Sequence, residues 1–128
     1  MAMKVFLITI AVFIGVCGFG AAGLFVYTNV ENSRGEDFVQ AGYHGDLNRA
    51  KRLLDSGVKV DFEFENGGTA LMGAAGNGHG EHVKYLLSRG ADPTKRDDEG
   101  KSAWDLAQDS TIKQVISAAV QKRRAVRH

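Results

Sequence analysis

The sequence predicts an all-α protein: a stack of helix–turn–helix repeats with projecting turns, preceded by one N-terminal hydrophobic helix. The first observation is an internal repeat of 33 residues, in which Gly45, Leu54, Gly57 and Gly67 recur as Gly78, Leu87, Gly90 and Gly100. The second is an apolar spacing typical of an amphipathic helix, which ends at a glycine in each copy. The third is a long uncharged run near the N-terminus. A period of this length is typical of proteins that bury their core by stacking repeats.

The uncharged run is the first expected element. After a short N-terminal region, residues 1–4, residues 5–27 form 23 consecutive residues without a charge. As a helix this run would be about 34 Å long, which is enough to span a bilayer. We therefore expect a signal anchor. Cleavage near Ala22 followed by secretion is the alternative, because small residues there suit a signal peptidase. Residues 28–35 are expected to form a linker.

The flanks of this run predict its orientation. Lys4 precedes it and a net acidic segment follows it, so the positive-inside tendency places the C-terminal domain outside the cytoplasm, in the periplasm of a bacterium. Small residues share one face of the expected helix, at Ala11, Gly15, Gly18 and Ala22. Such a face permits close contact with another membrane helix, although these residue types are also common in membrane helices generally.

The repeat domain is expected over residues 36–121 as an N-cap unit (36–66), a central repeat (67–99) and a C-cap unit (100–121). The N-cap unit keeps only residues 38–43 for its first helix, and its second helix carries apolar residues at helical spacing up to Gly57. The central repeat has the same second helix up to Gly90. Its shorter first helix begins after Thr69, a good N-cap residue.

The C-cap unit repeats this order with Ser102 as N-cap, and Asp105 completes a capping-box-like pair. Trp104 takes the position of Leu71, so we expect it in the core. An apolar stripe that includes Ile112 and Ile116 forms the last helix. The basic residues 122–128 are expected to be a frayed, solvated tail.

These motifs resemble the ankyrin-repeat family, whose unit is a turn followed by two antiparallel helices. The resemblance rests on Gly-Thr-Ala-Leu-Met at residues 68–72, on Ala74-Ala75, Gly78-His79 and Gly90-Ala91-Asp92, and on their partial recurrence up to Leu106-Ala107. The signature prolines are replaced by Ala70 and Ala103, and the signature histidines by Met72 and Asp105. The resemblance implies a scaffold that binds another protein.

Composition argues against several other functions. The chain has 16 basic and 15 acidic side chains; because Lys4 precedes the apolar run, residues 29–128 hold 15 of each sign, which gives no electrostatic case for nucleic acid. The single cysteine, Cys17, lies in the run and leaves the domain without a disulfide. No serine or cysteine pairs plausibly with a histidine, so we expect no enzyme, no catalytic residues, no cofactor and no small-molecule substrate. His79 and His82 lack a third ligand nearby, so we expect no metal.

The resemblance implies that a partner protein contacts the turn tips and the exposed side of the first helices. These positions are Tyr43, His44, Phe62, Glu63, Phe64, Glu65, Asn66, Met72, Gly76, Asn77, Lys95, Arg96, Asp98, Glu99, Lys101 and Asp105. Phe64 stands where the next unit has Asp97. It is either a binding anchor or a packing residue, whereas packing is favoured for Phe62.

The expected function is therefore a membrane-anchored adaptor, inhibitor or regulator that binds a partner protein through one small surface. Two alternatives stay open. One is a single-span accessory subunit of a membrane complex, in which the membrane helix itself is the recognition element. The other is an immunity protein that guards against a toxin or an enzyme.

Overall fold

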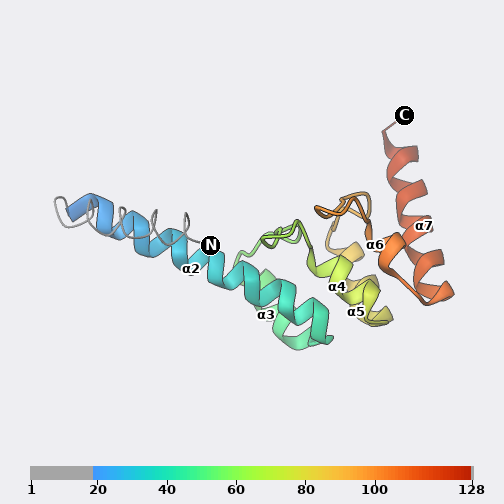
Figure 1. Ribbon diagram of the computed structural model, residues 1–128, viewed down its shortest axis with the longest axis horizontal. Coiled ribbons are helices and arrows are strands. Elements are labelled where there is room, and N and C mark those ends of the chain that lie inside the picture. The colour runs from blue at the N-terminus through green and yellow to red at the C-terminus, as the bar shows by residue number, and fades with distance from the viewer. Residues whose placement is uncertain (1–18, 128) are drawn as a thin grey trace. The chain divides into compact units, whose positions relative to one another are not determined.

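The computed structural model describes the backbone of residues 19–127 and the side chains of residues 30–127 (Figure 1). The chain divides into two compact units, Met1–Ser33 and Arg34–His128. Most of the expected membrane segment lies outside the described residues, and so do Ala11, Gly15 and Gly18 of its small-residue face. Within the described residues, no helix combines the length and the apolar character that crossing a bilayer requires.

The described residues fold into helices. In chain order they are α2 (Phe19–His44), α3 (Leu47–Asp55), α4 (Ala70–Gly76), α5 (Gly80–Ser88), α6 (Ala103–Leu106) and α7 (Ser110–Val126). α4 packs against α5 and α6, and α7 packs against the same two helices. The first turn (residues 57–69) and the second turn (residues 90–102) project from the same side of the stack (Figure 1). This is the predicted repeat of helix pairs and turns.

The 33-residue recurrence has a conformational cause. Its glycines have positive φ angles in matching pairs: 74° and 79° at Gly45 and Gly78, 100° and 90° at Gly57 and Gly90, and 73° and 78° at Gly67 and Gly100. Residues with a side chain rarely adopt this region, whereas glycine enters it freely. What repeats along the chain is therefore a set of backbone turns that only glycine forms without strain.

The structure corrects the expected linker at residues 28–35, which is helical. α2 continues through it to His44, so the first helix of the N-cap unit is not confined to residues 38–43. The absence of a side chain at Gly35 allows close packing, because a Cβ there would lie 2.3 Å from the Phe62 ring. Phe62 thus packs against α2, as predicted.

The expected frayed tail is also corrected, because α7 remains helical to Val126. Nothing between residues 110 and 126 is a glycine or a proline, the residues that most readily end a helix. The Arg123 guanidinium also pairs with Asp92 of the second turn at 3.3 Å. The last helix is therefore tied to the repeat before it.

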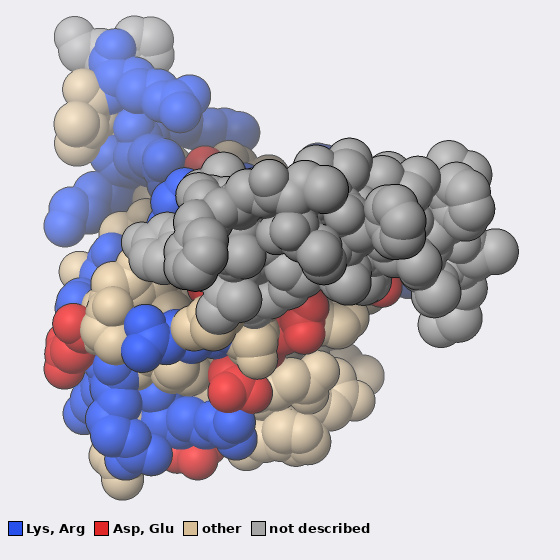
Figure 2. All heavy atoms as spheres, turned by 90° about the vertical axis from the view of Figure 1, so that its left-hand side faces the viewer, with Lys and Arg blue, Asp and Glu red and all other residues tan. Residues whose placement is uncertain are grey.

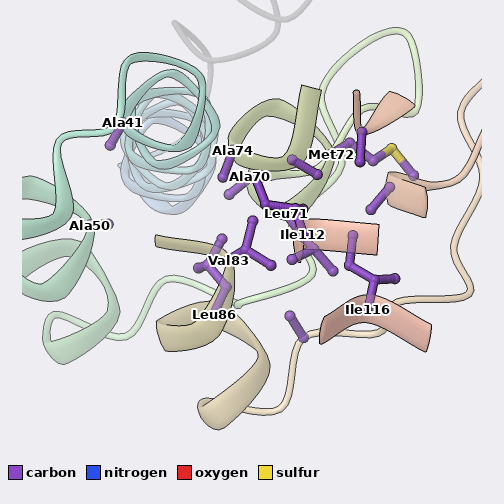
Figure 3. Packing of buried hydrophobic residues seen from close by; sticks show 14 of the residues in the cluster. Ala41, Ala50, Ala70, Leu71, Met72, Ala74, Val83, Leu86, Ile112 and Ile116 are labelled. Atoms are coloured by element: carbon purple, nitrogen blue, oxygen red, sulfur yellow. The ribbon is translucent and has the colours of Figure 1, made fainter. Parts of the chain in front are cut away.

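The core combines alanines with a few large side chains (Figure 3). Phe38, Leu71, Val83, Leu86 and Ile116 are fully buried, and alanines occupy many of the positions between them. At Gly42 the backbones of α2 and α4 approach closely, since a Cβ there would lie 2.5 Å from the carbonyl oxygen of Ala70. Small residues at these positions thus allow neighbouring helices to pack closely.

Trp104 does not join this core, contrary to expectation. It is 43% exposed, whereas Leu71, its counterpart in the preceding unit, is 1% exposed. Leu71 belongs to the same buried cluster as Ile112 of the following unit (Figure 3). No further helix pair among residues 30–127 follows α6 and α7, so the equivalent position of the last unit stays open. The Lys113 ammonium lies 4.7 Å from the centre of the Trp104 ring.

Local capping fixes where the helices begin. Thr69, Ser102 and Asp109 accept N-terminal amides of α4, α6 and α7, and Ser102 with Asp105 forms the predicted capping box.

The Asp109 cap of α7 yields a direct test. Its Oδ1 accepts from the Thr111 amide at 2.7 Å. Asp109→Ala leaves that amide without its protein acceptor and is expected to lower the free energy of unfolding by about 1 kcal/mol. Asp109→Asn keeps the acceptor and is the matched control. Urea denaturation measures both, and equal loss in the two variants would contradict a capping role.

Candidate functional site

The two turns pack side by side. The Asp92 amide donates to Asp61 Oδ1 at 2.8 Å, and the Asp98 amide donates to the Asn66 carbonyl oxygen at 3.0 Å. Between these bonds, the Lys95 ammonium pairs with the Glu63 carboxylate. The turns are thus linked along their length and present one continuous surface.

Each turn closes with the same backbone bond, but the side chain at its first position differs. The Phe64 amide donates to the Gly68 carbonyl at 2.8 Å, as the Asp97 amide does to Lys101 at 3.0 Å. In the second turn the Asp97 carboxylate also accepts the Glu99 and Lys101 amides. In the first turn Asn66 accepts the Gly68 amide instead. The ring of Phe64 therefore has no part in holding its turn together by hydrogen bonds.

A hollow of about 530 Å³ lies where the turns meet the first helices. Its lining comes from α2, the first turn, α4, the second turn and the end of α6: Val39, Gln40, Tyr43, Phe64, Asn66, Gly68, Thr69, Met72, Gly73, Gly76, Asn77, Asp97, Leu106 and Gln108. Tyr43 is 53% exposed, and its ring meets that of His44 edge to face with the ring centres 5.3 Å apart. Aromatic and amide side chains thus share one concavity.

Part of the predicted binding surface gathers at this hollow. Tyr43, Phe64, Asn66 and Asn77 line it, together with Gly76. Met72 was expected to be exposed, but this was wrong: it is 3% exposed and belongs to the core, because α6 packs against α4. Phe64 is half-buried and lines the hollow. Its ring therefore packs against the domain and is still accessible to a partner.

The predicted charged residues hold the turns together. Arg96 donates to the Gly100 carbonyl at 2.7 Å and pairs with Asp105 at 3.3 Å. Lys101 pairs with Glu99 at 2.7 Å. The hydrogen bond to Glu63 raises the pKa of Lys95, and the one to Glu99 raises the pKa of Lys101. These side chains are therefore engaged in interactions within and between the turns.

Asp105 has a local role as well. Hydrogen bonds from the amide and then the hydroxyl of Ser102 lower its pKa, and Arg96 adds to the effect. Of the remaining predicted residues, His44, Glu65 and Asp98 are exposed and do not line the hollow.

Several residues that line the hollow were not predicted from the sequence. Val39 and Gln40 precede Tyr43 by four and three residues, which places them on the same face of a helix. This helical spacing is visible in the sequence, but it places the residues on one face only if the helix includes Val39 and Gln40. Leu106 and Gln108 were missed because they enter the hollow through the packing of α6 on α4.

The two histidines of the central repeat have different surroundings. The His79 Nε2 donates to the Tyr43 carbonyl oxygen at 3.1 Å and so links α5 to the end of α2. His82 is 2% exposed, and neither ring nitrogen has a hydrogen-bond partner among the described residues. Burial, and next the charge of His79, lower the pKa of His82, while the charge of Asp46 and the Gly45 backbone oppose this effect more weakly. In the described part of the chain, no group of three or more potential ligands could hold a metal ion.

Comparison with known proteins agrees with this architecture. Residues 28–122 match the family model described as ankyrin repeats in three copies. The chain is 47% identical over 58 residues to the mouse "Ankyrin repeat, SAM and basic leucine zipper domain-containing protein 1", and 42% identical over 64 residues to the human protein of that name. These matches cover 45% and 50% of this chain but only 12% and 14% of the relatives, so the similarity concerns a small part of each relative.

Proposed function

Because this chain belongs to the ankyrin-repeat family, we propose that it is a membrane-anchored protein–protein interaction module whose partner enters the hollow beside Tyr43. Ankyrin repeats are typically non-enzymatic interaction modules. In this reading the domain acts by holding, blocking or regulating its partner.

The observation that carries the proposal is the hollow itself. Tyr43 offers an exposed aromatic ring at low entropic cost, and such rings are frequent anchors in interfaces. Asn77 and Gln108 add amide donors and acceptors that suit a peptide backbone. The concavity is small, so it fits a loop or an extended segment of the partner better than a flat domain surface.

The proposed anchor rests on the 23 uncharged residues from Val5 to Tyr27. A tether confines the domain to a membrane surface and raises its local concentration near a membrane-bound partner, so that modest affinity suffices. We place the domain on the extracytoplasmic side from the position of Lys4. Protease accessibility in sealed membrane vesicles of both orientations tests this sidedness.

Crosslinking and affinity capture from membranes test the binding surface. Tyr43→Ala and Phe64→Ala are expected to reduce the recovery of the specific partner about tenfold, because each removes an aromatic side chain from the lining of the hollow. Lys84→Ala is the matched control: Lys84 is exposed on α5, pairs with Glu81 and does not line the hollow.

The outcomes separate the proposal from its rivals. Unchanged recovery with both aromatic variants, at unchanged thermal stability, would overturn the hollow as the binding site. Replacing residues 5–27 with an unrelated hydrophobic helix addresses the accessory-subunit alternative. Capture that survives this exchange supports recognition by the repeats, and capture that is lost supports recognition by the membrane segment.

A further inference from the structure

The open end of the last unit forms a second surface, separate from the hollow beside Tyr43. Trp104 is exposed there because no helix pair packs on it among the described residues. A hollow of about 500 Å³ lies between the second turn, α6 and α7, with Pro93, Trp104 and Val120 in its lining. An exposed tryptophan beside an apolar concavity is a feature of binding surfaces.

This hollow continues into a smaller one of about 260 Å³. The two share Thr94, Val120 and Arg124, so they form one groove along α7. Ser117 and Gln121 supply hydroxyl and amide groups within it. The groove therefore has an apolar part near Trp104 and polar groups beside it.

The charge of the groove has one sign. Arg96, Arg123, Arg124 and Arg127 line it, and no aspartate or glutamate does. Arg96 and Arg123 have carboxylate partners, whereas Arg124 and Arg127 form no ion pair with any described residue. Figure 2 shows lysine and arginine side chains gathered over the last turns of α7, at the top of the view. The groove thus has unneutralised positive charge.

We propose that this groove binds an acidic segment of a partner protein, with an apolar side chain of that segment against Trp104. The cations pair with the carboxylates of the segment, and the hydroxyl and amide groups bond its backbone. An extended polyanion fits less well, because residues 29–128 carry equal numbers of acidic and basic side chains. The apolar part also favours a peptide over a purely ionic ligand.

Trp104 is the only tryptophan of the chain and is therefore a built-in reporter of the groove. The probe is a tryptophan-free peptide of glutamates around one central phenylalanine, titrated into the full chain in detergent. We expect a blue shift of the Trp104 emission on binding. Arg124→Glu is expected to weaken the peptide affinity at least tenfold. Arg124→Lys keeps the positive charge and is expected to retain most of the wild-type affinity.

Arg52→Glu is the matched control, because it makes the same change of charge at an exposed position on α3, outside the groove. Equal weakening by Arg52→Glu would overturn the proposal in favour of general charge attraction. So would equal binding of a peptide of glutamates without the phenylalanine.

Other occupants are tested in the same assay. An equal blue shift with anionic lipid vesicles or with single-stranded nucleic acid would contradict the proposal. The proposal would also be contradicted if the chain dimerised with rising concentration and this dimerisation, without any peptide, shifted the Trp104 emission. Tyr43→Ala is expected to leave the peptide affinity unchanged, so failure here is distinguishable from failure at the hollow beside Tyr43.

Discussion

Gly42→Ala is expected to lower the free energy of unfolding by about 3 kcal/mol, which is a large share of the stability of a small repeat domain. A Cβ at Gly42 would lie 2.5 Å from the carbonyl oxygen of Ala70 and 2.8 Å from its Cα. Both are backbone atoms, so no side-chain rotation relieves the clash. α2 and α4 must separate, which exposes the apolar surface between the first two units.

Gly76→Ala is the matched control, since it adds the same methyl group to a helical glycine. Its Cβ would lie 3.7 Å from Leu106 Cβ, an ordinary contact. This variant is expected to be neutral or more stable by up to about 1 kcal/mol, because alanine loses less conformational entropy than glycine on folding. Urea denaturation of both variants measures the difference. If Gly42→Ala matches Gly76→Ala, α2 and α4 are not in close contact.

His82→Val is expected to raise the stability of the domain, most clearly at acid pH. His82 is buried without a hydrogen-bond partner among the described residues, and leaving such a group unsatisfied costs about 1–3 kcal/mol. The equivalent position 33 residues later is Val115, so a branched apolar side chain suits this place in the repeat. We expect a gain of about 1 kcal/mol at neutral pH.

The pH dependence follows from the direction of the shift. The pKa of His82 is lowered in the folded state from its ordinary value of 6.5, mainly by burial. Below pH 6.5 His82 therefore binds a proton more readily in the unfolded chain than in the folded chain. The contribution of neutral His82 to stability is therefore complete above pH 6.5 and is lost as the pH falls towards the lowered pKa. His82→Val has no imidazole at this position, so its stability does not fall with pH for this reason.

Thermal unfolding between pH 8 and pH 5 measures the effect. The melting temperature of the wild type is expected to fall more steeply on acidification than that of His82→Val. His44→Ala removes an exposed histidine and serves as the control. Parallel curves for the wild type and His82→Val would mean that the buried imidazole is solvated in the folded state, which contradicts the burial argument.

The local features of the fold could be predicted from the sequence. The glycine pair Gly57 and Gly90 predicted the ends of the second helices, and Thr69 and Ser102 predicted the starts of α4 and α6. These interactions involve residues a few positions apart, so they leave a periodic trace in the chain. The helical conformation of residues 28–35 was not predicted from the sequence, and the contact of Gly35 with Phe62 joins residues 27 positions apart.

The candidate site was predictable only in part, for a similar reason. Tyr43 and Phe64 were found from their place in the repeat, and both line the hollow. The pairing of Arg96 with Asp105 and of Lys95 with Glu63 was not visible in the sequence, because each joins residues that meet only in the packed structure. Several residues expected to face a partner are therefore engaged within the domain.

By itself, the sequence determined the repeat, its glycine turns and its helix caps, since short-range sterics and hydrogen bonds set these features. Only the tertiary structure decided which equivalent positions are buried. Met72 and Asp105 occupy the same place in successive units, as do Leu71 and Trp104, yet the first of each pair is buried and the second is exposed. The physical reason is that burial depends on the neighbouring unit: α6 and α7 cover the central repeat, and no described helix pair covers them.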